Sequence, residues 1–88
     1  MTVFVVLNVS DPDKVGEALK TNFGENYLQI SSGEWLVAAS GLTAKDISDK
    51  LGISEGTSGS AIIFTTAGYW GRAPNNIWEW IGAKIQQP

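Results

Sequence analysis

The stretch that decides the fold is Thr2-Val3-Phe4-Val5-Val6-Leu7-Asn8, a near-continuous apolar run rich in valine. A strand that is apolar at successive positions has both of its faces covered, so this run predicts a central strand of a sheet. The rest of the chain must then supply the neighbouring strands and the covering layers. With 88 residues, we expect one domain, residues 1–88.

Two helices are predicted by their end signals. Asp11 is a good N-cap, and Pro12 suits the first helical position, where no backbone N–H is needed. This first helix is expected to stop at Gly24. The second is expected between Thr43, its N-cap, and Gly52, which ends it.

Alternating apolar residues, β-branched runs and a Ser-Gly turn predict three further strands at residues 26–31, 34–40 and 61–67. A third helix is expected over residues 75–85. Its apolar residues recur at helical spacing and define an inner side: Ile77, Trp78, Ile81 and Ile85.

The resulting order, β-α-β-β-α-β-α, predicts an α+β protein. Its first six elements match the ferredoxin-like βαββαβ arrangement, with strand order 4-1-3-2, right-handed crossovers and both crossover helices on one sheet face. The last helix is an addition to that pattern. This order places the most apolar strand in the middle of the sheet, as its sequence requires.

The second face of the sheet is expected to be apolar as well. Val3, Val5 and Leu7 alternate along the first strand with Phe4 and Val6, so either side carries large apolar residues. A bare face of this kind is unusual in a monomer. The cover is expected to be the C-terminal helix, a second copy packed sheet to sheet, or both. The pattern leaves open which face the crossover helices take.

Composition argues against several classes of function. The chain has no Cys and no His, so it lacks the best thiol nucleophile, the commonest general base and the usual zinc ligands. The net charge is −3, from 9 acidic and 6 basic residues without a basic cluster, which makes nucleic-acid binding unexpected though not ruled out. We expect no cofactor, no membrane association and a cytoplasmic location.

The most unusual segment is Gly68-Tyr69-Trp70-Gly71-Arg72. Tyr, Trp and Arg dominate binding hot spots, so Tyr69, Trp70 and Arg72 are candidate binding residues. Trp80 joins them because it falls off the apolar stripe of the last helix and is expected to face outward. The competing interpretation is structural: the Trp side chains anchor the last helix to the sheet and Arg72 caps or stacks.

Two other segments have simpler interpretations. Asp11 and Asp13 follow the first strand and could hold Mg²⁺, but helix capping and the helix dipole account for both carboxylates without a metal. The Ser- and Gly-rich loop 54–60 leads from a helix into a strand, the reverse of a phosphate-binding loop, and lacks its Lys, so a mobile connector is expected.

We therefore expect a small non-enzymatic interaction or regulatory domain, an accessory subunit or an inhibitor of a larger assembly. It is expected to be homodimeric and to contact a protein partner through the aromatic segment. One alternative is a metal-dependent nuclease or nucleic-acid-binding protein, since small ferredoxin-like endonucleases of the CRISPR-associated and toxin type share the order of elements. That analogy involves no sequence motif and carries over no residue. The other alternative is a small-ligand binder.

Overall fold

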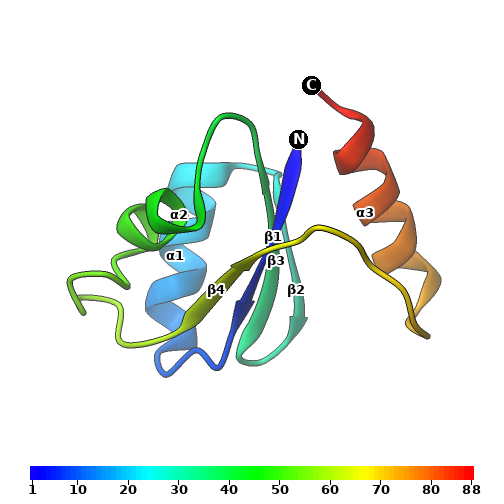
Figure 1. The fold of residues 1–88 in the computed structure, drawn as a ribbon. Coiled ribbons are helices and arrows are strands. Elements are labelled where there is room, and N and C mark those ends of the chain that lie inside the picture. Colours follow the sequence, from blue (N-terminus) through cyan, green and yellow to red (C-terminus); the bar gives the residue numbers. More distant parts are fainter.

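The computed structural model describes all 88 residues and has three layers (Figure 1). The sheet contains β1 (Thr2–Leu7), β2 (Tyr27–Ser31), β3 (Glu34–Ala39) and β4 (Ile62–Thr65). On one side of the sheet lie α1 (Pro12–Phe23) and α2 (Ala44–Leu51), and on the other lies α3 (Asn75–Gln86). The α+β class and the predicted order of elements are confirmed.

The strand order is β2-β3-β1-β4, which reads 4-1-3-2 from the opposite edge. All three neighbouring pairs are antiparallel. The central position of β1 fits its apolar sequence, because both of its edges are paired and both of its faces carry buried residues, Phe4 and Val6 on one and Val3 on the other. β4 has a neighbour on one side only, so it forms one edge of the sheet.

The predicted helix ends are formed by the expected side chains. Asp11 accepts a hydrogen bond from the backbone N–H of Lys14 at 3.2 Å, which satisfies one of the free amides of α1. At α2, Thr43 and Asp46 make a complete capping box, in which each side chain accepts from the other residue's backbone N–H. Gly52 then ends α2 in the left-handed conformation, with φ 76°.

The main core lies between the sheet and the pair α1 and α2. Phe4 and Val6 of β1 point to this side and are completely buried. The crossover helices α1 and α2 therefore cover the face that carries Phe4 and Val6, a choice that the sequence pattern did not decide. Ten buried apolar residues make up the cluster: Phe4, Val6, Val15, Leu19, Phe23, Trp35, Val37, Ala39, Ile47 and Leu51. Because each large apolar side chain contributes about 1.5–3 kcal/mol on full burial, this cluster dominates the stability of the fold.

A smaller core lies on the second face, under α3. Ile81 of α3 packs there with Val3, Leu36 and Ala38, and all four are buried. Of the covers that the sequence left open for this face, the C-terminal helix therefore supplies one. Ile85, predicted on the inner side of that helix, is instead 42 % exposed. The helix is rotated so that Lys84 faces the sheet edge, where its Nζ donates to Asn26 Oδ1 at 2.9 Å.

α3 is also held at its C-terminal end. The amino group of Met1 donates to the carbonyl of Gln87, and Ser40 Oγ donates to the carbonyl of Pro88 at 2.8 Å. These contacts bring the start of β1, the residue after β3 and the end of α3 together, and both chain ends lie near each other in Figure 1. None of the helices is long and apolar enough to cross a bilayer.

Most element boundaries match the predicted ones to within one residue, but β4 is shorter than expected. The strand ends at Thr65, although the backbone N–H of Thr66 still donates to the carbonyl of Val3 at 3.0 Å. Beyond that point the chain turns away toward α3. Shortening of this edge strand leaves Gly68 and the residues after it outside the sheet.

Candidate functional site

The aromatic segment Gly68–Arg72 lies in the connection between β4 and α3, outside regular secondary structure. Gly71 has φ 145°, a conformation that L side chains rarely adopt, and no atom lies near the position a Cβ would take. Glycine therefore permits a backbone turn here without any packing restraint. The turn separates the aromatic pair of the segment from Arg72.

One aromatic of the segment is bound to α3. The rings of Tyr69 and Trp78 stack with a centroid distance of 5.8 Å and an interplanar angle of 26°. Trp78 is half-buried and packs against the second core, so the stack fixes the segment on the helix. Tyr69, Trp70, Gly71 and Trp78 line a pocket with a volume of about 310 Å³.

Trp70 has a different environment from every other tryptophan in the chain. Its side chain is 100 % exposed, whereas Trp35 is buried in the main core and Trp78 and Trp80 pack against the second core. Burial of an indole is among the largest apolar contributions that one side chain makes. Full exposure of Trp70 therefore leaves a large, adaptable apolar surface unused within this chain.

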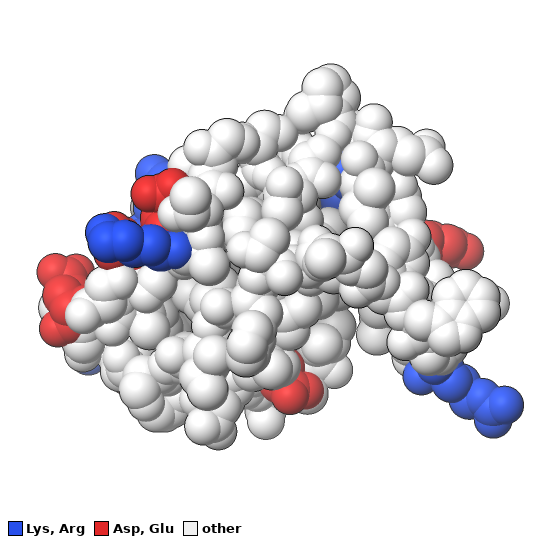
Figure 2. All heavy atoms as spheres, in the orientation of Figure 1, with Lys and Arg blue, Asp and Glu red and all other residues white.

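Arg72 is exposed and makes no ion pair or hydrogen bond to another residue. It is also the only charged residue between Gly56 and Trp78. Figure 2 shows the charges gathered mainly over the α1 and α2 layer and at the opposite margin. The centre of the view, over β4, is almost uncharged apart from one acidic group near its lower edge.

The predicted outward position of Trp80 is wrong. Trp80 is half-buried against the second core, and Lys84 Nζ lies 6.0 Å from the centroid of its ring. Lys84 donates at the same time to Asn26 beside β2, so Trp80 and Lys84 together attach α3 to that edge of the sheet. Trp80 thus serves the anchoring role that the competing interpretation gave to the tryptophans, while Trp70 does not.

An apolar stripe lies on the uncovered part of the second face. Val5 pairs with Phe64 and Leu7 pairs with Ile62, so these four side chains point to the same side as Val3. Ile62 and Phe64 are 52 % and 53 % exposed. We call Val5, Leu7, Ile62 and Phe64 the β4 stripe. It lies on the face that α3 only partly covers.

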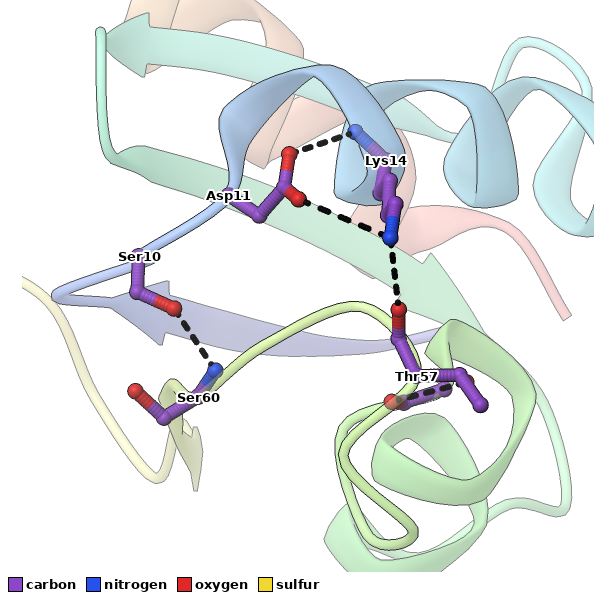
Figure 3. A network of polar contacts seen from close by, with 6 residues as sticks. Ser10, Asp11, Lys14, Thr57 and Ser60 are labelled. Atoms are coloured by element: carbon purple, nitrogen blue, oxygen red, sulfur yellow. Dashed lines mark hydrogen bonds and ion pairs between the residues drawn. The ribbon is translucent and has the colours of Figure 1, made fainter.

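The two aspartates considered as metal ligands have structural surroundings. Asp11 caps α1 through Oδ1, and its Oδ2 lies 4.0 Å from Lys14 Nζ (Figure 3). Asp13 is exposed in the first helical turn, where a negative charge complements the helix dipole. The chain has no group of three or more carboxylate, Cys or His side chains placed to hold a metal ion.

The loop expected to be a mobile connector is docked on the start of α1 (Figure 3). Ser60 N donates to Ser10 Oγ at 2.8 Å, Ser10 N donates to the Ser60 carbonyl at 3.0 Å, and Lys14 Nζ lies 3.4 Å from the Thr57 carbonyl. Ser58 is buried. The hydroxyl-rich sequence therefore satisfies backbone groups within the chain, which a ligand-binding loop would leave free.

Shifted pKa values occur on the exposed surface of α2. The Thr43 backbone N–H lowers the pKa of Asp46, and a hydrogen bond from Lys45 lowers the pKa of Asp49. The same contact, a 2.8 Å pair with Asp49, raises the pKa of Lys45. Capping and an i,i+4 ion pair explain all three, so these shifts indicate helix stabilisation.

The structure thus places Tyr69 and Trp70 at one pocket, leaves Arg72 exposed two residues after Trp70, and separates Trp80 from them. Sequence reasoning missed Trp78, whose stacking on Tyr69 completes the pocket. Its helical spacing with Ile81 identified it as a core residue, which it also is. Trp78 lies nine positions after Tyr69 and in a different element, α3, so no local pattern reports the contact between the two rings. Comparison of the sequence with protein-family models and with curated proteins finds no match to either.

Proposed function

We propose that this protein is a non-enzymatic interaction domain that binds a protein partner through Trp70 and its neighbours. The observation that carries the proposal is the complete exposure of Trp70 beside the anchored Tyr69–Trp78 stack. A rigid base, a free indole and an unpaired Arg72 form the set of residues that dominates protein interfaces. The stack supports the segment before binding, which reduces the entropy lost on association.

The test is affinity capture from native lysate with the tagged chain of 88 residues. The control carries Trp70→Ala and Arg72→Ala, because both side chains are exposed and neither contacts the core. A second control, Lys20→Ala, changes an exposed residue on α1. We expect a partner that is captured by the parent chain and by the Lys20 variant and lost from the double variant. Equal capture by all three would contradict the proposal, provided that circular dichroism shows each to be folded.

We further propose a ferredoxin-like architecture, extended by α3, for a cytoplasmic homodimer. The strand order and the two helices on one face support the architecture. The β4 stripe supports dimerisation, because Ile62 and Phe64 are more than half exposed beside a free strand edge. Sedimentation equilibrium should give a dimer mass for the parent chain and a monomer mass for Phe64→Lys.

The pocket supports small-ligand binding as a second candidate function. Its volume of about 310 Å³ is at the lower end of the range of about 300–1,000 Å³ for small-molecule sites. Three of its four lining residues are aromatic, so a flat ligand would stack there. Quenching of tryptophan fluorescence by a nucleotide library, absent in Trp70→Ala, would establish this function.

The nuclease alternative has its own test, Mg²⁺-dependent cleavage of RNA or DNA that Asp11→Asn abolishes.

A further inference from the structure

The pocket beside Trp70 has room for one or two side chains of a partner. Its volume is about 310 Å³, and it is lined by Tyr69, Trp70, Gly71 and Trp78 and open to solvent. Tyr69 and Trp78 are held by their mutual stack, so one wall is fixed. Trp70 is free to close over an inserted group, since nothing else in the chain contacts its exposed ring. An inserted apolar side chain would gain contact with three aromatic rings.

Two charged residues adjoin the lining residues in the sequence, Arg72 after Gly71 and Glu79 after Trp78, and Arg72 is the only cation of the two. Arg72 follows Gly71 directly, is exposed and has no acidic partner within the chain. An unpaired guanidinium prefers a carboxylate or a phosphate, which it can hold through two parallel hydrogen bonds. Arg72 therefore favours an anionic group on the partner, near the inserted apolar side chain in the partner's sequence.

The number of cations distinguishes a single anion from a polyanion. Between Gly56 and Trp78 there is no charge other than Arg72, and the charged residues that flank this stretch, Glu55 and Glu79, are acidic. A nucleic acid strand is bound largely through several Lys and Arg side chains that neutralise successive phosphates. Arg72 is a single cation, and the nearest charged residues on either side of it in the sequence are acidic. It therefore matches a partner segment that is apolar apart from one carboxylate.

We infer that this site recognises a peptide segment in which a large apolar residue is followed or preceded closely by one Asp or Glu. The inference rests on the proposed function and specifies its partner. The apolar side chain enters the pocket between Trp70 and the Tyr69–Trp78 stack. The carboxylate accepts hydrogen bonds from the Arg72 guanidinium. The aromatic rings supply most of the affinity, and Arg72 supplies the selection.

The experiment uses the full chain and synthetic labelled peptides, with fluorescence anisotropy as the readout. Each peptide carries one leucine or phenylalanine and one aspartate, separated by zero to three glycines. Its matched partner has asparagine in place of the aspartate. We expect the aspartate peptides with the best spacing to bind about two- to fivefold more tightly than their asparagine partners, as for a solvent-accessible ion pair. The preference should weaken as salt is added.

Variants assign the two parts of the site. Arg72→Gln should bind aspartate and asparagine peptides equally while retaining its apolar affinity. Arg72→Glu should reverse the selection and favour lysine peptides, a gain that cannot result from loss of folding. Trp70→Ala should weaken all peptides alike and leave the melting temperature unchanged. Lys20→Ala should behave as the parent chain.

The outcomes separate this inference from the proposed function. A partner captured from lysate through Trp70, together with peptides that bind without regard to charge, overturns the inference and leaves the interaction domain standing. Failure of both capture and peptide binding below about 1 mM overturns both. Tighter binding of a thymidine oligonucleotide of about 15 nucleotides than of any peptide, competing with the peptides, overturns the inference in favour of nucleic acid.

Discussion

The stacked rings of Tyr69 and Trp78, 5.8 Å apart at their centroids, join the irregular segment after β4 to the helix that covers the second sheet face. Trp70 is the next residue along the chain after Tyr69, yet it contacts no core residue and is completely exposed. The contact therefore gives Tyr69 a structural role and leaves Trp70 free to contact a partner.

The two tryptophans should accordingly differ in their effect on stability. We expect Trp70→Ala to change the free energy of unfolding by no more than about 0.5 kcal/mol, as for other surface substitutions. Trp78→Ala removes a half-buried ring and the stack and should cost about 1–3 kcal/mol. Urea denaturation of the two variants measures both values. Equal destabilisation would show that Trp70 packs against the protein in solution.

Attachment of α3 depends on one buried side chain. Ile81→Ala should destabilise the protein by about 2–4 kcal/mol, because Ile81 is only 6 % exposed between the helix and the sheet. Ile85→Ala is the matched control, since Ile85 has the same chemistry on the same helix but is 42 % exposed. Its effect should stay within about 0.5 kcal/mol. Similar losses from both substitutions would contradict the observed rotation of α3.

Docking of the loop before β4 can be tested at its glycines. Gly59 has φ 81°, and a Cβ there would overlap with Ser10 Oγ and lie 3.3 Å from Asp11 Cβ. Gly56 has φ 85° but open space around it. Gly56→Ala should cost about 1–2 kcal/mol for the left-handed backbone alone. Gly59→Ala should cost more, since the loop must also move away from α1. Thermal unfolding of both variants gives the difference, and equal costs would mean that the loop is not docked.

The Asp46 carboxylate should contribute stability that depends on pH. Its hydrogen bonds at the start of α2 lower its pKa below the ordinary value of 3.8. The contribution is therefore fully present above the unfolded-state pKa and is lost as the pH falls below about 3.8 toward the folded-state pKa. Asp46→Asn should be less stable than the parent chain at neutral pH. The gap between their free energies of unfolding should narrow in acid.

Urea denaturation of both proteins at neutral pH and near pH 3 measures this gap. Glu17→Gln is the control for loss of one negative charge, because Glu17 is exposed on α1 and takes part in no side-chain hydrogen bond. A gap for Asp46→Asn that stays constant as the pH falls would contradict the proposed origin of the stability.

Much of this fold could be predicted because its signals are local. The apolar run of β1, the cap residues Asp11 and Thr43 and the terminating Gly52 each determine their element through neighbours a few residues away. The rotation of α3 could not be predicted in the same way. Ile85 continues the apolar spacing, but contact between Lys84 and Asn26, 58 residues apart in the chain, turns a different side of the helix to the sheet.

Prediction of the candidate site was also limited by contacts between residues that are distant in the sequence. The composition of Gly68–Arg72 identified Tyr69, Trp70 and Arg72, since those residue types are typical of interfaces. Composition carries no information on which ring is buried. Trp80 lies against the second core and Trp70 does not, because the middle and last turn of α3 meet the sheet beside β2, a strand distant in sequence.

The contacts of Met1 with Gln87 and of Ser40 with Pro88 make the two ends of the chain energetically dependent on each other. Loosening of the last turn of α3 removes the partner of the first residue before β1, and loosening of that residue releases α3. Amide hydrogen exchange should therefore show the end of α3 and the first residues of β1 opening as one unit, at lower free energy than the strands over the main core. Separate exchange of the two ends would show that they are independent.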